Sequence, residues 1–195
     1  QIPGYSGGYG LDAGAHIWRL PAAGGTIDAP LQLDMTTQPS GVYSAKVTEG
    51  LLQFNGATHS GATIQQSVDI VHVNSRQSAF GAGWGLSGLQ QLVENPDGSA
   101  LIINGDGSQL IFRKAAGNGG RYVTPIGHFS QLARRPGGGW TLTTPDQTVS
   151  SFDRGGKLVS IVDRNHNSTT FDYDVAGRLI RVTDPVGLQT NFTIG

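Results

Sequence analysis

The sequence predicts an all-β protein, in which an antiparallel β-sandwich-like unit precedes a β-meander that continues into a spiralling sheet of repeats. Gly accounts for 30 of 195 residues and charged residues for only 14 %, whereas typical domains have about 7 % Gly and about 25 % charged residues. Short runs of alternating apolar and polar residues lie between clusters of Gly, Pro, Asn, Asp and Ser, as in strands joined by tight turns. The last part of the chain also repeats its own pattern. Together these observations favour many short strands.

The first 79 residues are divided by composition into a lead-in and a strand-rich segment. Residues 1–24 are rich in Gly, Ala and Pro, and predict an irregular lead-in with one strand at 16–20. Residues 25–79 predict a β-sandwich-like, plug-type unit. Its strands are expected where apolar and polar residues alternate, at 31–35, 41–48 and 68–73.

Residues 80–195 are predicted to form the rest of the chain, beginning with a Gly-rich segment. Gly83-x-Gly85-x-x-Gly88 matches the pattern of a dinucleotide-binding loop. That site requires a preceding parallel strand and a following helix, and the sequence continues instead into turn and strand signals. The segment therefore predicts a β corner kinked by Gly and anchored by aromatic residues.

Two Asp-Gly-Ser units, Asp97–Ser99 and Asp106–Ser108, each precede a run of apolar residues. Asp-Gly between apolar runs is a strong hairpin signal, because both residues tolerate a positive φ. A β-meander is therefore expected from this point onward.

An internal repeat follows, in which residues 152–163 overlay residues 173–184 with an offset of 21. Each copy has an aromatic strand, an Asp-x-x-Gly turn, a basic residue followed by Leu, and a second strand. Gly supplies the positive φ of the turn and Asp caps it through its carboxylate. The repeat-motif residues are Phe152, Asp153, Gly156, Tyr173, Asp174, Gly177, Arg178 and Leu179.

The segment 171–187 closely resembles a tyrosine-aspartate (YD) repeat of the rearrangement-hotspot (RHS) and teneurin-like family. The resemblance covers roughly residues 75–195: the segment 80–112 is similar to the region that leads into such repeats, and residues 152–163 resemble a degenerate copy. Residues 30–75 are more loosely similar to the β-domain that plugs or starts the shell of these proteins.

The resemblance implies a sheet that spirals into a hollow extracellular shell, which in toxins encloses a polypeptide cargo and in adhesion proteins forms a rigid body. We therefore expect a non-catalytic structural segment of a bacterial secreted or cell-surface protein. Its expected partners are the remaining repeats of the parent chain, or other copies that pair through sheet edges.

An alternative function is carbohydrate binding, with Trp84 and Trp140 as stacking platforms for sugar rings. Exposed, coplanar rings would favour this alternative, and buried rings would favour the scaffold. An enzyme of carbohydrate metabolism is a third alternative, because carboxylates cluster around Asp172 and Asp174. In the repeat, however, Asp174 is expected to cap a turn.

No catalytic residue, metal ligand or cofactor is expected. The five His residues lack metal-ligand spacing. The run 163–167 opens like a calcium loop but lacks the Gly and Glu that such a loop needs. Cys is absent, so no disulfide can form.

The charge balance gives no electrostatic reason to expect binding to nucleic acid or to an anionic membrane. The net charge is −1, and the basic pairs Arg113-Lys114 and Arg134-Arg135 are too few to predict a patch. Membrane insertion is not expected, because no apolar run approaches the roughly 18 residues of a membrane helix.

Overall fold

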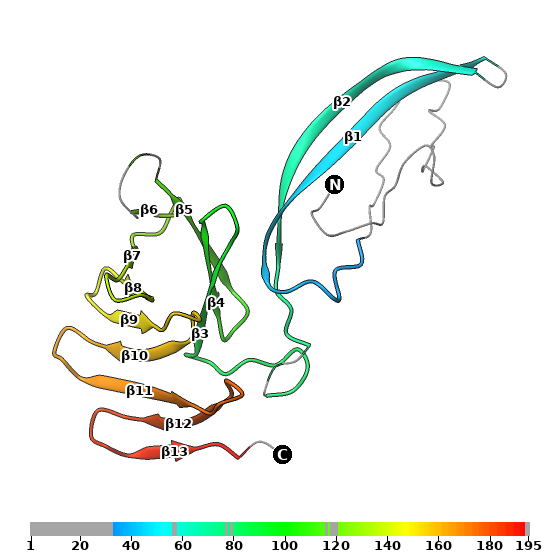
Figure 1. Ribbon diagram of the computed structural model, residues 1–195. Coiled ribbons are helices and arrows are strands. Elements are labelled where there is room, and N and C mark those ends of the chain that lie inside the picture. Colours follow the sequence, from blue (N-terminus) through cyan, green and yellow to red (C-terminus); the bar gives the residue numbers. More distant parts are fainter. Residues whose placement is uncertain are drawn as a thin grey trace. The chain divides into compact units, whose positions relative to one another are not determined.

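The computed structural model describes residues 33–55, 58–76, 78, 80–115, 117 and 121–193 (Figure 1). The chain divides into two units, Gln1–His72 and Val73–Gly195. Every regular element in the described ranges is a strand, and neighbouring strands are antiparallel, which confirms the predicted all-β class. A search of these same ranges finds no helix that could span a membrane.

The first unit contains one long β-hairpin, formed by β1 (Gly41–Asn55) and β2 (Thr58–His72). The pairing runs without a shift from Gly41 opposite His72 to Asn55 opposite Thr58. At about 3.3 Å per residue, each 15-residue strand is about 50 Å long. A small cluster packs Met35 and Ala45 with Leu33, Tyr43 and Ile70.

This hairpin differs from the sandwich-like unit predicted for residues 25–79. The predicted strands 41–48 and 68–73 are found, but the described residues of the segment form a single two-stranded sheet. The reason lies in residues 49–67, where Thr, Ser and Gln continue both strands. Leu33–Met35 is not a strand, and the predicted lead-in 1–24, the strand 16–20 and residues 25–32 lie outside the described residues.

The second unit contains two sheets whose strands follow one another in chain order (Figure 1). The four-stranded sheet consists of β3 (Gln90–Glu94), β4 (Ala100–Asn104), β5 (Gln109–Lys114) and β6 (Tyr122–Val123). The seven-stranded sheet consists of β7 (Gln131–Arg134), β8 (Trp140–Thr143), β9 (Val149–Phe152), β10 (Leu158–Val162), β11 (Ser168–Tyr173), β12 (Leu179–Thr183) and β13 (Gln189–Asn191). The predicted meander is therefore observed.

One type of five-residue turn recurs in eight hairpins of this unit. The first residue donates its N–H to the carbonyl of the fifth, and the fourth donates its N–H to the carbonyl of the first. The fourth residue has a positive φ, as in a type I turn with a G1 bulge; it is Gly in six turns, Gln147 (φ 68°) in another and His166 (φ 65°) in the last. The turns begin at Asn95, Asn104, Arg135, Thr144, Asp153, Asp163, Asp174 and Asp184.

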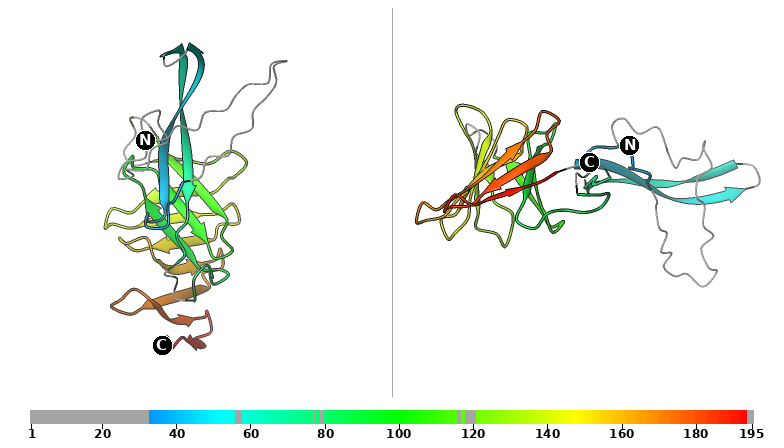
Figure 2. Two further views of the ribbon diagram at one scale, coloured as in Figure 1. Left: turned by 90° about the vertical axis from the view of Figure 1, so that its right-hand side faces the viewer. Right: turned by 90° about the horizontal axis from the view of Figure 1, so that it is seen from below.

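The second unit curls until its first strand meets a later hairpin, as the views in Figure 2 help to show. An isolated bridge between Arg121 and Ala133 connects the β6 side to β7. On the other side, the N–H of Leu92 in β3 donates to the carbonyl of Gly156 at 2.8 Å, and Gln91 bridges to Lys157. The strands β3–β9 thus form one closed turn, and β10–β13 extend beyond it.

The interior of this first turn is filled, in contrast to the hollow shell that the family resemblance implies. Strands from both sheets contribute to one core, and Phe112 and Phe152 have no exposed surface. The buried members of this core are, in β3–β9, Leu92, Ala100, Ile102, Phe112, Leu132, Trp140, Leu142 and Phe152, together with Leu158 at the start of β10. Large side chains reach the axis because the curl is tight, so this end of the sheet is closed.

The Gly-rich segment before β3 is a loop with positive φ at Gly81, Gly83 and Gly88. The predicted kinks are therefore present, but Trp84 is not an anchor, because 72 % of its surface is exposed. Phe80 anchors the loop instead and contacts Phe192 edge to face, with ring centroids 6.2 Å apart. Strand β3 follows directly, so the dinucleotide interpretation lacks the helix it requires.

Candidate functional site: the seam that closes the first turn

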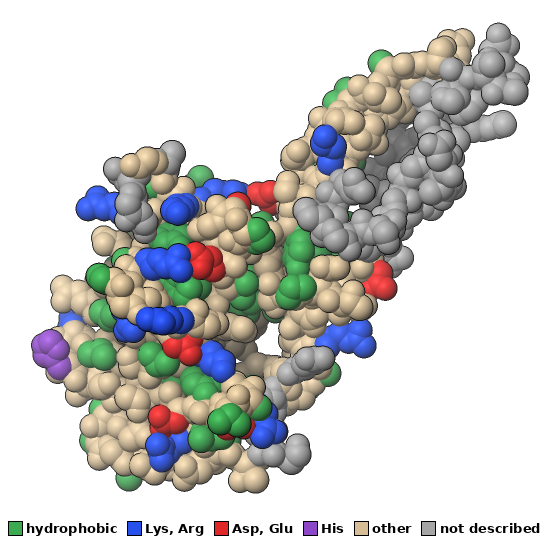
Figure 3. Space-filling model, in the orientation of Figure 1, with side chains coloured by type: hydrophobic (Ala, Val, Ile, Leu, Met, Phe, Trp, Pro, Cys, Tyr) green, Lys and Arg blue, Asp and Glu red, His purple; other side chains and the backbone are tan. Residues whose placement is uncertain are grey.

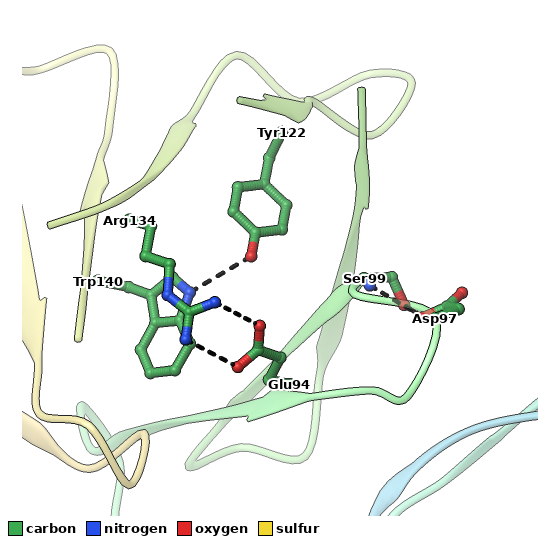
Figure 4. Close-up of polar contacts among 6 residues, drawn as sticks. All are labelled: Glu94, Asp97, Ser99, Tyr122, Arg134 and Trp140. Carbon is green, nitrogen blue, oxygen red and sulfur yellow. Dashed lines mark hydrogen bonds and ion pairs between the residues drawn. The ribbon is translucent and has the colours of Figure 1, made fainter. Parts of the chain in front are cut away.

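The seam is the set of contacts that closes the first turn, and its polar part joins β3 to β7. Both guanidinium NH groups of Arg134 donate to the carboxylate of Glu94, at 2.8 and 3.3 Å (Figure 4). The same guanidinium lies 5.0 Å from the centroid of the Trp140 ring. Trp140 Nε1 donates to the hydroxyl of Tyr122 at 3.4 Å. The charge pair, the cation–π contact and the hydrogen bond to Tyr122 thus hold four strands in one arrangement.

This geometry contradicts the carbohydrate-stacking hypothesis for Trp140. Only 2 % of its surface is exposed, because the ring lies in the core with Arg134 above it. A sugar would therefore find no free ring face. Trp84 is exposed but lies on the loop before β3, so the two rings do not form a coplanar row.

The backbone part of the seam depends on Gly156, which has a φ of 80°. A Cβ atom at this position would overlap the carbonyl oxygen of Leu92. Gly156 therefore serves the turn, as the sequence predicts, and also allows the close approach of β3. The repeat pattern alone signals only the first of these two roles.

The aromatic residues of the two repeat copies occupy equivalent positions. Phe152 pairs with Leu158 and Tyr173 pairs with Leu179, and a bulge adjoins each pair. The Tyr173 hydroxyl donates to the carbonyl of Leu158 at 2.8 Å, which links one copy to the next. Burial, with a smaller contribution from the charge of Asp153, raises the pKa of Tyr173 to about 12.

Lys157 lies close to both the Tyr173 ring and Gly177. Lys157 Nζ lies 5.3 Å from the centroid of the Tyr173 ring, and a Cβ on Gly177 would overlap the same amine. The Gly of one repeat thus makes room for the basic residue of the previous repeat, a contact between copies that the sequence spacing does not reveal.

The repeat aspartates cap their turns, as predicted. Asp153 Oδ1 accepts the backbone N–H groups of Gly155 and Lys157. Asp174 accepts the backbone N–H of Arg178 and also binds its Nε, each at 2.8 Å. The backbone hydrogen bond and the guanidinium bond hold the pKa of Asp174 below its usual value.

The earlier turns use a different cap, which the sequence interpretation did not distinguish. Asp97 and Asp106 occupy the third turn position, where each accepts both the N–H and the hydroxyl of the Ser two residues later. The hydroxyl hydrogen bond of Ser99 or Ser108 is the main reason that the pKa of each aspartate is lowered. The position of the acid within the five-residue turn, third or first, would have distinguished the two kinds of cap in the sequence.

The described residues contain no group of three His, Asp or Glu that could hold a metal ion. Asp163, in the run that opens like a calcium loop, instead accepts hydrogen bonds from Asn165 and Asn167. Asp172, considered as a glycosidase acid, pairs with Arg181 at 2.8 Å.

A concave pocket of about 330 Å³ lies against β10–β13. Its lining residues, which include Phe171 and Phe192, are apolar or hydroxyl-bearing and none is titratable.

Comparison with known proteins identifies the repeats. The RHS Repeat family profile matches residues 152–189. The tRNA nuclease WapA of Bacillus subtilis strain 168 is 33 % identical over 108 residues, and the tRNA3(Ser)-specific nuclease WapA of Bacillus spizizenii is 34 % identical over 101 residues. These matches cover 55 % and 51 % of this chain but only 4 % of each relative. The chain carries an RHS repeat, which confirms the predicted resemblance.

Proposed function

We propose that this chain, with its RHS repeat, is a non-catalytic structural segment that forms the closed end of an extracellular shell, such as a toxin-encapsulating or adhesion scaffold. The observation that carries the proposal is the closure of β3 onto the β9–β10 turn at Gly156. A sheet that has closed one filled turn blocks the passage along its axis. Strands added after β13 would then extend the wall.

The graded burial of the strands supports this function. Trp140 and Leu142 in β8 are buried, whereas β10–β12 have mostly half-buried side chains and all three residues of β13 are exposed. The apolar pocket begins where the core ends. This is the expected transition from a solid cap to a wall with an inner face.

The nuclease activity in the names of the relatives is not assigned to this segment. The matched region is 4 % of each relative, and the acids of the repeats are occupied as turn caps or in ion pairs. We assign the segment to the scaffold of such a protein. Incubation of the purified chain with tRNA should leave the RNA intact, and reproducible cleavage would overturn this assignment.

A disulfide across the seam tests the closure itself. The chain contains no Cys, so Gln91→Cys with Lys157→Cys introduces a single thiol pair at a bridged position. Antiparallel partners have Cα atoms about 4.5–5.5 Å apart, which is within the range that a disulfide spans. We expect intramolecular cross-linking under mild oxidation, measured by loss of free thiols and by peptide mapping.

The matched control is Gln91→Cys with Arg178→Cys, which places the second thiol on the same turn position one repeat later. We expect no intramolecular bond in this pair. Equal cross-linking of the two pairs, or none in the bridged pair, would show that β3 does not close the first turn.

A further inference from the structure

The charge of the second unit is segregated, although the chain as a whole is nearly neutral. Residues 107–145 contain no Asp or Glu, but include five of the 13 Lys and Arg residues of the chain. This stretch covers β5, β6, β7 and β8, and its basic residues lie between β5 and the end of β7. Figure 3 shows Lys and Arg side chains gathered over this region, at the upper left of the molecule, with few acidic side chains. The sequence shows two separate basic pairs, and the fold places them on β5 and at the end of β7, on either side of β6.

The strand register places three arginines on the outer face of these strands. Arg113 lies opposite Val123, and Arg121 lies opposite Ala133. Arg135 follows Ala133 by two residues and begins the turn directly after β7, so it lies on the same side as Ala133. The neighbours Phe112 and Leu132 point into the core, so the alternating arginines point away from it.

Exposed apolar side chains adjoin this basic face. The exposed fractions are 55 % for Val123, 103 % for Ile126 and 80 % for Phe129, within seven consecutive residues. Gly127 has a φ of 82°, and His128 donates its N–H to the carbonyl of Pro125 at 3.1 Å. This tight turn makes Ile126 project from the surface. Together these side chains form a basic apolar corner, which consists of Arg113, Arg121, Val123, Ile126, Phe129 and Arg135.

We propose that the basic apolar corner is a peripheral docking surface for an anionic lipid bilayer. Projecting apolar side chains enter the boundary between headgroups and acyl chains, while surrounding arginines contact anionic headgroups. Charge complementarity favours this occupant, because the arginines lie on or next to the strands that flank the apolar turn. Two acids lie near this surface: Glu94 pairs with Arg134, and Asp97 binds Ser99 and also interacts electrostatically with Arg113.

The test is vesicle flotation of the full chain. Vesicles of phosphatidylglycerol and phosphatidylcholine should carry the protein upward, whereas vesicles of phosphatidylcholine alone should not. Added salt should weaken binding, because exposed charges are screened. Ile126→Ser with Phe129→Ser should reduce the partition coefficient more than about tenfold, and Arg121→Gln should reduce it about fivefold.

Matched variants distinguish binding through this surface from nonspecific binding to vesicles. Val175 and Val186 are also exposed apolar turn residues, at 109 % and 81 %, so Val175→Ser with Val186→Ser should leave binding unchanged. Arg164→Gln, in an exposed turn, is the control for Arg121→Gln. Circular dichroism melting of each variant verifies folding, and the surface positions make loss of structure unexpected.

Two outcomes would overturn the proposal. One is the absence of binding to anionic vesicles, or binding that the control pair reduces as strongly as Ile126→Ser with Phe129→Ser. The other combines two results. Soluble polyglutamate binds, and its binding depends on Arg121 but not on Phe129. Vesicle binding is equally insensitive to substitution of Phe129. That result would identify an acidic polymer or protein as the partner instead of a bilayer.

Discussion

The hairpin β1–β2 and the curled sheet β3–β13 are both antiparallel, but they differ in strand length and in how much of their side-chain surface is buried. Each strand of the hairpin runs for 15 residues, and Leu51 and Ile64 along it are 67 % and 64 % exposed. In the curled sheet no strand exceeds six residues, and a five-residue turn recurs within the meander. Frequent turns let the sheet curl and bury its inner face.

The comparison teaches that turn spacing sets strand length, whereas closure determines burial. The hairpin contains β-forming residues but no turn signal between 41 and 55, so its pairing simply continues. In the curled sheet, each turn reverses the chain before the strand extends beyond the core. Three substitutions, each with a control, test this comparison, and the largest expected effects are at the seam and in the filled turn.

Gly156→Ala should be among the most destabilising of these changes. The φ of 80° costs a non-Gly residue roughly 1–2 kcal/mol, and the overlap of the new Cβ with Leu92 adds about 1–3 kcal/mol. Gly187→Ala is the control: its φ is 88°, but nothing lies within 4 Å of the added Cβ. Urea unfolding followed by Trp fluorescence measures both free energies. Equal losses would mean that the close approach of β3 contributes nothing.

Phe152→Ala should cost about 3–5 kcal/mol, because it leaves a cavity in the filled turn where the side chain is fully buried. Leu51→Ala in the hairpin should change the free energy of unfolding by less than about 0.5 kcal/mol, because that side chain is mostly exposed. Denaturant melts of both variants provide the comparison. A large effect at Leu51 would show that the hairpin face is covered in solution.

Tyr173 should give the smallest effect, visible only at alkaline pH. Its pKa of about 12 in the folded chain exceeds the usual value near 10. Its contribution to stability is therefore fully present below pH 10 and decreases as the pH rises from 10 to 12.

Absorbance titration of tyrosinate should show a transition near pH 12 in the native chain, which Tyr173→Phe removes. Tyr43→Phe is the control in the first unit, where burial alone raises the pKa. A Tyr173→Phe variant that retains the transition near pH 12 would contradict this assignment.

Most of the second unit was predictable from local sequence. Asp97-Gly98 and Asp106-Gly107 specify their hairpins because few residue types accept a positive φ, and the 21-residue repeat locates the later strands. The roles of Asp153, Asp174, Gly156 and Gly177 in their turns follow in the same way. These features depend on contacts within five residues.

Contacts between distant residues were not predictable in this way. Leu92 meets Gly156, Glu94 pairs with Arg134, and the interior side chains fill the first turn. The single hairpin in place of a sandwich is a similar case, because a strand pattern does not say how many sheets will pack. Trp140 shows the limit of prediction from local sequence, because its sequence neighbours are compatible with either a sugar-stacking platform or a core residue.

The sequence by itself therefore determined the all-β class, the turns and the identity of the repeats, because turn stereochemistry is local. Only the tertiary structure decided that the sheet closes after one turn, that Trp140 is buried, and that basic residues from β5 to β7 share a face. Curl accumulates from small twists over many strands. Its outcome depends on how side chains far apart in the chain fill the space between them.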